Sequence, residues 1–171
     1  MPTVRIAVGL GLLVVALATQ VTMLARLPLP GATPDLVLVT VVALALAYGP
    51  AYGLVAGFGA GIATDLVPPA DGAVGRWAFV LTLVGYLAGL AKVEIRRSAF
   101  VPLIVVSVAA GLSVVLYAVL AALSGDEHVT RGAVVALLPT SVLYAVVLTP
   151  FVVPGVLVLA DRVEPDPVLL R

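Results

Sequence analysis

Asp65 is the ionisable residue whose position most suggests chemistry. It ends a glycine-rich apolar run, and only two apolar residues separate it from Pro68. A carboxylate near lipid needs water, a cationic partner or a proton. Arg26 and Arg76 are the candidate cationic partners. We therefore expect Asp65 to form a helix cap or an ion pair, and contact with a partner protein is the alternative.

Asp35 is a second carboxylate beside an apolar run, and it has a simpler explanation. Thr33, Pro34 and Asp35 directly precede that run. A threonine at the cap, a proline in the first turn and an acid near the positive end of the helix dipole all favour a helix start. Asp35 is therefore expected to start a helix, and a functional contact is the alternative.

Metal and enzyme chemistry find little support in the sequence. His128 is the single histidine, and its neighbours Asp126 and Glu127 lack a spacing that would hold ligands on one face. Cysteine is absent, which excludes disulfides and thiolate metal sites. No serine–lysine or serine–histidine pair lies at a catalytic depth, and there is no phosphate-binding loop. We expect no enzyme activity, no metal and no cofactor.

The composition explains why so few polar groups are available. Of the 171 residues, 63% are apolar and 11% are charged, and the mean hydropathy is +1.26. Soluble globular domains do not have this composition, so most of the surface is expected to face lipid. Nine basic and nine acidic residues give zero net charge, and no basic patch exists to bind a run of phosphates. Nucleic-acid binding is therefore not expected.

The apolar runs predict an all-α, polytopic membrane protein of one integral domain over residues 1–171. The six predicted spans are about 6–24, 36–48, 51–67, 77–91, 100–123 and 140–160, followed by a short cytoplasmic tail, 161–171. The second and third spans are separated at Gly49-Pro50, because one helix over 36–67 would measure about 48 Å against a hydrocarbon core of about 30 Å. A five-span protein with one long helix there is the alternative.

Two other stretches leave alternatives open. The first run could be a cleaved signal peptide, since Ala16-Leu17-Ala18 has the small-x-small form of a cleavage site. Retention as a first helix fits better, because the apolar run continues beyond that point. Residues 131–138 are expected to form a short interfacial segment before the last span, in which Pro150 and Pro154 predict a kink.

Lysine and arginine predict the orientation in the membrane. With six spans, six basic residues fall on the inside and three on the outside. Those inside are Arg5, Lys92, Arg96, Arg97, Arg162 and Arg171, and those outside are Arg26, Arg76 and Arg131. Both termini are therefore expected in the cytoplasm. The five-span alternative places Arg26 inside and Arg5 outside, which again gives six against three and puts the amino terminus outside.

Glycines recur at helical spacing in two of the predicted spans. Gly49, Gly53, Gly57 and Gly61 are four residues apart, and Gly85 and Gly89 repeat the spacing. Small residues at this interval allow two helix backbones to approach closely. Packing within the bundle is the expected use, and an interface with a partner or with a second copy is the alternative. The sequence leaves homo-oligomerisation open.

A series of short motifs resembles a known family. Pro34-Asp35-Leu36 opens an apolar helix, and it is followed in order by Tyr48-Gly49-Pro50, by the run from Gly53 to Asp65 and by Leu81-x-x-x-Gly85-Tyr86-Leu87-Ala88-Gly89. The chain thereby resembles the rod shape-determining protein MreD family. The resemblance covers roughly residues 26–97 by motif and the other spans by hydropathy and length. After Asp65 the sequence Val67-Pro68-Pro69-Ala70-Asp71 replaces the glycine-rich turn expected of the family.

The resemblance implies a non-enzymatic component of the bacterial cell-wall elongation (rod) complex in the inner membrane. Such a component binds MreC, a single-span protein, and through it links MreB filaments to the RodA glycosyltransferase and its transpeptidase. A fold similar to the substrate-binding component of energy-coupling factor transporters is also implied. The candidate partner-contact or structural residues are Pro34, Asp35, Gly53, Gly57, Gly61, Asp65, Gly85 and Gly89.

The same likeness leaves a second function open. The chain would then be a vitamin-type, small-molecule substrate-binding component of an energy-coupling factor transporter. That function requires a pocket lined by polar side chains. The polar residues of the apolar runs are scattered instead, which weakens a transport function without excluding it.

Overall fold

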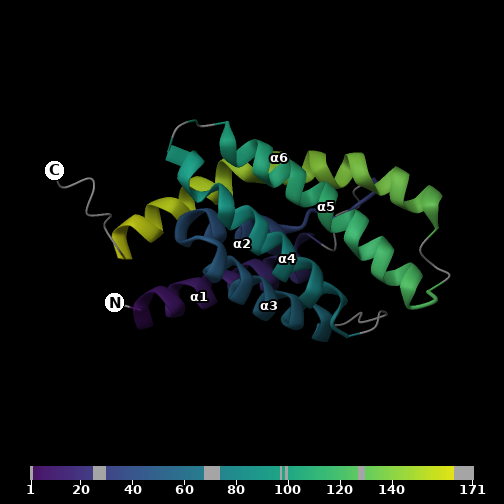
Figure 1. Cartoon of the computed structure of the whole chain (residues 1–171), viewed down its shortest axis with the longest axis horizontal. Helices are drawn as coiled ribbons and strands as arrows, with labels where there is room; N and C mark the ends of the chain where they lie inside the picture. The colour runs from purple at the N-terminus through teal and green to yellow at the C-terminus, as the bar shows by residue number, and fades with distance from the viewer. Residues whose placement is uncertain are drawn as a thin grey trace.

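The computed structural model describes residues 2–24, 30–67, 74–96, 98, 100–126 and 130–163, and all regular structure in them is helical. The elements are α1 (Pro2–Thr22), α2 (Leu36–Tyr48), α3 (Pro50–Leu66), α4 (Arg76–Leu90), the 3₁₀ helix η2 (Ala91–Arg96), α5 (Val101–Leu123) and α6 (Arg131–Val163). The all-α prediction is confirmed. Successive helices reverse direction, so α6 ends at the same end of the bundle at which α1 begins (Figure 1).

Helix α2 is the centre of the molecule. It is apolar on every side, and residues 37–46 are each at most 3% exposed. A helix that is hydrophobic all round must be enclosed by protein or by lipid. Here α1, α3, α4, α5 and α6 all contact α2. The apolar character of this helix therefore serves the protein core.

The chain turns back at Gly49, between α2 and α3. Gly49 has φ +98°, which favours glycine, and Pro50 follows as the first residue of α3. The Gly49 N–H donates to the Ala45 carbonyl at 2.7 Å and so closes α2. The predicted break at Gly49-Pro50 is confirmed, and the alternative of one long helix is wrong.

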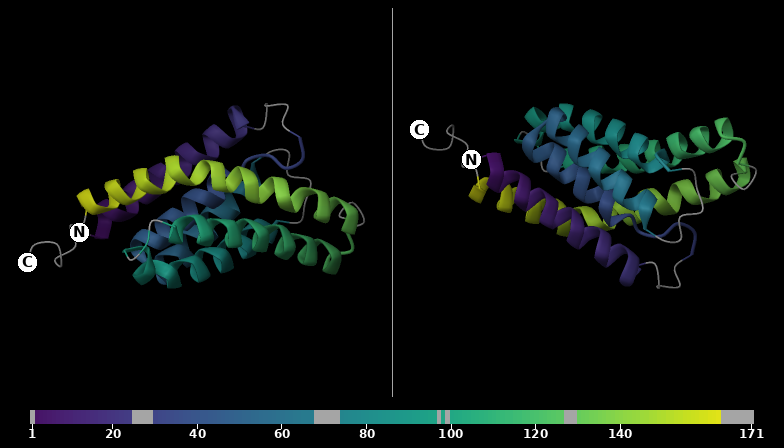
Figure 2. Two further views of the ribbon diagram at one scale, coloured as in Figure 1. Left: turned by 90° about the horizontal axis from the view of Figure 1, so that it is seen from above. Right: turned by 90° about the horizontal axis from the view of Figure 1, so that it is seen from below.

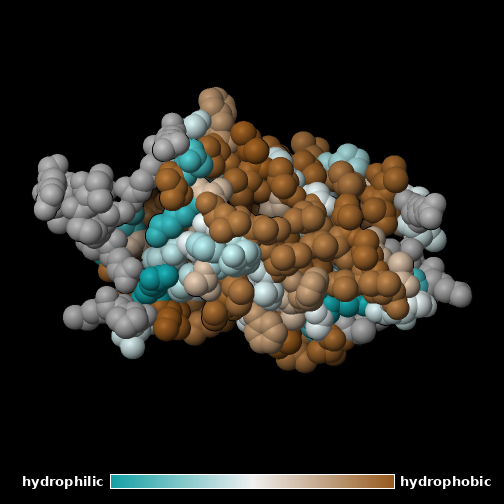
Figure 3. Space-filling view, in the orientation of Figure 1, coloured by the Kyte–Doolittle hydropathy of each residue, from teal (hydrophilic) through white to brown (hydrophobic). Residues whose placement is uncertain are grey.

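Four helical segments of the described chain are long and apolar enough to cross a membrane: Thr3–Thr22, Arg76–Glu94, Val101–Leu123 and Gly132–Val163. The protein is thus a polytopic membrane protein. Helices α2 and α3, with 13 and 17 residues, are shorter than the roughly 20 residues that a span usually needs. On the face drawn in Figure 3 a broad hydrophobic surface covers the middle, and the most hydrophilic side chains gather towards the two ends. The six-span topology stays a prediction.

Helix α4 lies within one residue of its predicted span at each end, whereas α6 differs from its predicted form. The α-helix of α4 ends at Leu90 and tightens into η2, where Lys92 is exposed. Helix α6 runs unbroken from Arg131, so residues 131–138 belong to it and do not form a separate interfacial segment. It contains Pro139, Pro150 and Pro154, and it bends along its length (Figure 2). Prolines produce such bends because each removes one backbone donor.

Candidate functional site

The repeated glycines bring the backbones of α3 and α4 into contact. A Cβ atom on Gly53 would collide with the Gly85 carbonyl, and one on Gly57 would collide with the Leu81 carbonyl. A Cβ on Gly61 would meet the backbone of Ala78. Backbone atoms cannot move aside as a flexible side chain can. The spacing of four residues therefore has a packing explanation within the chain.

The facing glycines of α4 make the same contact in return. A Cβ on Gly85 would strike the Gly53 carbonyl, and one on Gly89 would strike the backbone of Pro50. All five of these glycines are buried. The two helices thus form one tightly packed antiparallel hairpin. A role of these glycines in contact with a partner stays a prediction.

Asp65, at the end of α3, caps the start of α4. Its Oδ2 accepts hydrogen bonds from the N–H groups of Gly75 at 2.8 Å and Ala78 at 3.2 Å, and its Oδ1 accepts from Trp77 at 3.2 Å. The N-cap position of α4 is Gly75, which has no side chain to supply an acceptor. Asp65 therefore satisfies, from another helix, the donors that a helix start leaves free.

The predicted ionic partners of Asp65 must be revised. Arg76 pairs with a different carboxylate, that of Asp126, so an Asp65–Arg76 ion pair is wrong. Arg26, the other expected partner, lies outside the described residues. The other structural role expected of Asp65 was a helix cap, and its three hydrogen bonds to the start of α4 are those of a cap.

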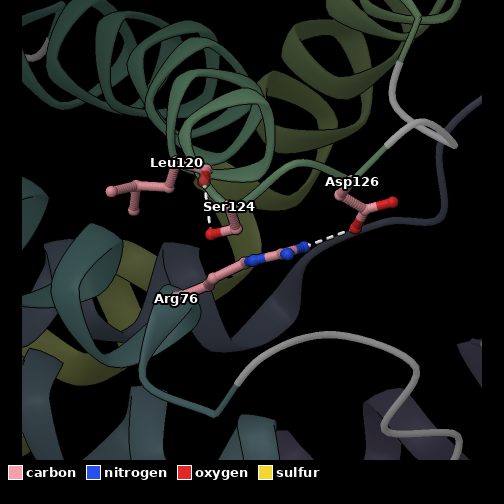
Figure 4. A network of polar contacts seen from close by, with 4 residues as sticks. All are labelled: Arg76, Leu120, Ser124 and Asp126. Carbon is pink, nitrogen blue, oxygen red and sulfur yellow. Dashed lines mark hydrogen bonds and ion pairs between the residues drawn. The ribbon is translucent and has the colours of Figure 1, made fainter.

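The Arg76–Asp126 pair joins the start of α4 to the residues that follow α5 (Figure 4). The Arg76 Nη1 lies 2.7 Å from the Asp126 Oδ2, and Arg76 is 8% exposed. The guanidinium also lies 5.8 Å from the ring centroid of Tyr117. In the same loop the Ser124 hydroxyl donates to the Leu120 carbonyl at 2.8 Å, which helps to end α5. From the sequence, Asp126 was considered only as a neighbour of His128, and this ion pair was missed. The signal that could have indicated it was the presence of opposite charges beside two helix ends.

A double-mutant cycle should detect the coupling of this pair. We expect Arg76→Gln and Asp126→Asn together to cost less than the sum of the two single substitutions, with a coupling of about 1 kcal/mol, because the Asp126 carboxylate remains partly exposed to solvent. Unfolding by sodium dodecyl sulfate in detergent micelles measures the three free energies. Additive effects would show that the contact contributes no pairwise stability.

The side chains of Asp35 and of Gln20 in α1 hold the start of α2. The Asp35 Oδ1 accepts from the Leu38 N–H at 2.8 Å, and the Gln20 Oε1 of α1 accepts from the Val37 N–H at 2.9 Å. Asp35 is itself the N-cap, so the expectation of Thr33 at that position is wrong. Burial raises the pKa of the Asp35 carboxyl, and hydrogen bonds from the Leu38 backbone and the Gln20 side chain oppose this shift.

The segment before α2 is fixed by α6. The Ala32 N–H donates to the Thr140 Oγ1 at 3.1 Å, and the Tyr144 hydroxyl donates to the Pro30 carbonyl at 3.0 Å. Pro34 in the same segment is buried. Pro34 and Asp35 thus lie where α1, α2 and α6 meet.

Replacing Asp35 by alanine should destabilise the bundle by about 1 kcal/mol, the usual cost of losing an N-cap acceptor. Asp35→Asn keeps a side-chain oxygen and should cost only a few tenths of the stability lost with alanine. The SDS-unfolding midpoints of the two variants measure the difference. Equal losses would mean that the carboxylate charge, and not the cap, matters at this position.

At the opposite end of the bundle one cation, Arg5, lies against two tyrosine rings. The Arg5 guanidinium lies 4.3 Å from the ring centroid of Tyr48 and 4.7 Å from that of Tyr52. The two rings are 4.7 Å apart, and the Tyr52 hydroxyl donates to the Arg5 carbonyl at 3.1 Å. Such contacts between a cation and an aromatic face are attractive. They attach the start of α1 to the α2–α3 turn.

Comparison with known proteins decides the family. The family model of rod shape-determining protein MreD matches residues 3–161, which is nearly the whole chain. The chain belongs to the MreD family. MreD proteins are generally non-enzymatic membrane proteins that determine cell shape. No curated protein and no solved structure matches the chain, so the likeness to energy-coupling factor components stays a prediction.

The structure places the candidate residues inferred from the MreD resemblance in two regions of the bundle. Asp65 and Asp35 lie at the same end of the bundle, each at a helix start that it caps, whereas the glycines run along the α3–α4 contact. Among the described residues no group of three or more histidine, cysteine or acidic side chains is placed to hold a metal. His128 and Glu127 lie outside the described residues.

Proposed function

We propose that this MreD family protein is a non-enzymatic scaffold of the cell-wall elongation complex in the bacterial inner membrane. In this role it binds an MreC-like single-span protein and supports RodA and its transpeptidase indirectly. The match to the family model over residues 3–161 carries the proposal. Six spans with both termini in the cytoplasm complete the proposed topology.

Features of the fold support a scaffold role. The α3–α4 hairpin is packed backbone to backbone, and side chains of other helices, Gln20 of α1 and Asp65 of α3, accept hydrogen bonds at the starts of α2 and α4. Interlocked elements of this kind resist relative movement, because shifting one helix breaks contacts in another. A rigid bundle with a wide hydrophobic surface suits a protein that positions other membrane proteins.

Co-purification tests the proposed function. The tagged full chain is extracted from its native membrane in mild detergent, and the proteins recovered with it are identified by mass spectrometry. We expect MreC-like and RodA-like proteins. Recovery of paired ATPases with a coupling membrane subunit would instead establish the vitamin-uptake alternative and overturn the scaffold proposal.

A matched pair of variants shows whether recovery depends on the Asp65 end. Asp65→Ala removes all three acceptor contacts, whereas Asp65→Asn keeps one oxygen. We expect recovery of the MreC-like protein to fall with Asp65→Ala and to be largely kept with Asp65→Asn. Recovery that is unchanged in both would place the partner surface elsewhere on the bundle.

A further inference from the structure

A groove of about 250 Å³ runs along the outer side of the bundle between α1 and α3, which lie beside each other in Figure 1. Its lining includes Ile6, Leu10 and Leu17 of α1 and Tyr52, Gly59 and Ala63 of α3. Nearly all of the lining surface is apolar. From residue 6 to residue 17 the groove follows about 16 Å of helix. That length is close to half of a hydrocarbon core of about 30 Å, which is the depth of one leaflet.

One end of this groove is charged. Arg5 lies one helical turn before Gly9, which lines the groove, and so both are on the same face of α1. Tyr52 lines the groove and also contacts the Arg5 guanidinium and the Arg5 carbonyl. Arg5 is partly exposed. A partly exposed guanidinium thus lies at one end of an apolar groove whose length is close to the depth of one leaflet.

We propose that this groove binds one anionic phospholipid, with an acyl chain between α1 and α3 and the phosphate at Arg5. The guanidinium suits a phosphate because its planar array of donors matches phosphate oxygens. Basic positions between membrane helices are typical sites for anionic headgroups. The positive charge of Arg5 at one end of the groove favours a lipid with an anionic headgroup over a purely apolar partner helix. This lipid site is independent of the proposed partner.

Gly59 offers a way to fill the groove without disturbing the fold. A Cβ on Gly59 would meet no atom within 4 Å, so Gly59→Leu should place its side chain where the acyl chain is proposed to lie. Gly11 of α1 also has open space around it and does not line the groove. Gly11→Leu is therefore the matched control, because it adds the same side chain to an exposed helical glycine.

Native mass spectrometry of the purified full chain measures the binding of phosphatidylglycerol and of phosphatidylcholine with identical acyl chains. We expect the wild-type chain to bind one phosphatidylglycerol about tenfold more tightly than phosphatidylcholine. Gly59→Leu should weaken phosphatidylglycerol binding about tenfold, and Gly11→Leu should leave it unchanged. Arg5→Gln should abolish the preference between the two lipids, and Arg5→Lys should retain it.

Three outcomes would overturn the lipid site. The first is equal affinity for the two lipids in the wild-type chain. The second is that Gly59→Leu binds phosphatidylglycerol as tightly as the wild-type chain does. The third is that Gly59→Leu loses a co-purified polypeptide and keeps its bound lipid, which would make the groove a protein-binding site. Thermal unfolding of each variant in detergent checks that it is folded. A loss of lipid binding with an unchanged melting temperature is then caused by the change in the groove and not by unfolding.

Discussion

Replacing Gly57 by alanine is expected to lower the free energy of unfolding by about 2 kcal/mol, within the range for overpacked cores. The added methyl group would collide with the Leu81 carbonyl, which belongs to the backbone of α4 and cannot rotate away. The two helices would have to separate, and the buried contacts beside Gly53 and Gly61 would loosen with them. Unfolding by SDS in micelles measures the loss.

Gly59→Ala is the matched control for Gly57→Ala. It lies two residues further along α3, and a Cβ there meets nothing within 4 Å. Alanine has a higher helix propensity than glycine by about 1 kcal/mol, so this control should leave stability unchanged or raise it. If both variants unfolded at the same SDS concentration, the close approach of α3 and α4 would contribute nothing to stability.

The glycine pattern shows how far the sequence could predict this fold. Spacing alone indicated that two backbones approach closely, and the order of apolar runs placed α3 and α4 next to each other in the chain. Spacing could not identify the facing residues, because a glycine has no side chain whose size or charge would mark its partner. The contacts of Gly57 with Leu81 and of Gly61 with Ala78 depend on the register of the hairpin, which only the three-dimensional structure fixes.

Polar contacts between distant residues were harder to predict. In the sequence Gln20 is one of several polar residues scattered through the apolar runs, yet its side chain accepts a hydrogen bond from Val37 at the start of α2, 17 positions along the chain. The Arg76–Asp126 pair joins residues 50 positions apart. Single-sequence patterns report local periodicity, and contacts of this kind depend on which helix ends meet. The sequence could predict only that each carboxylate or helix start near lipid requires a partner, and not which residue supplies it.

For helix α2 the sequence predicted the helix but not its surroundings. Its apolar residues predicted a span, since a continuous apolar run has the same appearance whether lipid or protein surrounds it. The structure encloses it with five other helices. Its 13 residues, which are few for a span, were the signal that its surroundings are protein.

Asp65→Ala is expected to destabilise the bundle by about 2–3 kcal/mol. Loss of an N-cap acceptor usually costs about 1 kcal/mol, and Asp65 serves three N–H groups that would be left without that acceptor. The start of α4 should fray first. Trp77, the only tryptophan, lies there, so its fluorescence measures unfolding at this end.

Asp65→Asn separates the cap from the charge. Asparagine keeps the side-chain oxygen that can accept from the α4 backbone but replaces the second oxygen with a donor, so we expect about half of the loss seen with alanine. Because the same residue closes the α3–α4 hairpin that Gly57 packs, Gly57→Ala and Asp65→Ala should be less than additive when combined. Full additivity would mean that the cap and the glycine contact stabilise the hairpin independently. A Trp77 signal that changes only when the whole bundle unfolds would show that α4 is held at its start by contacts other than Asp65.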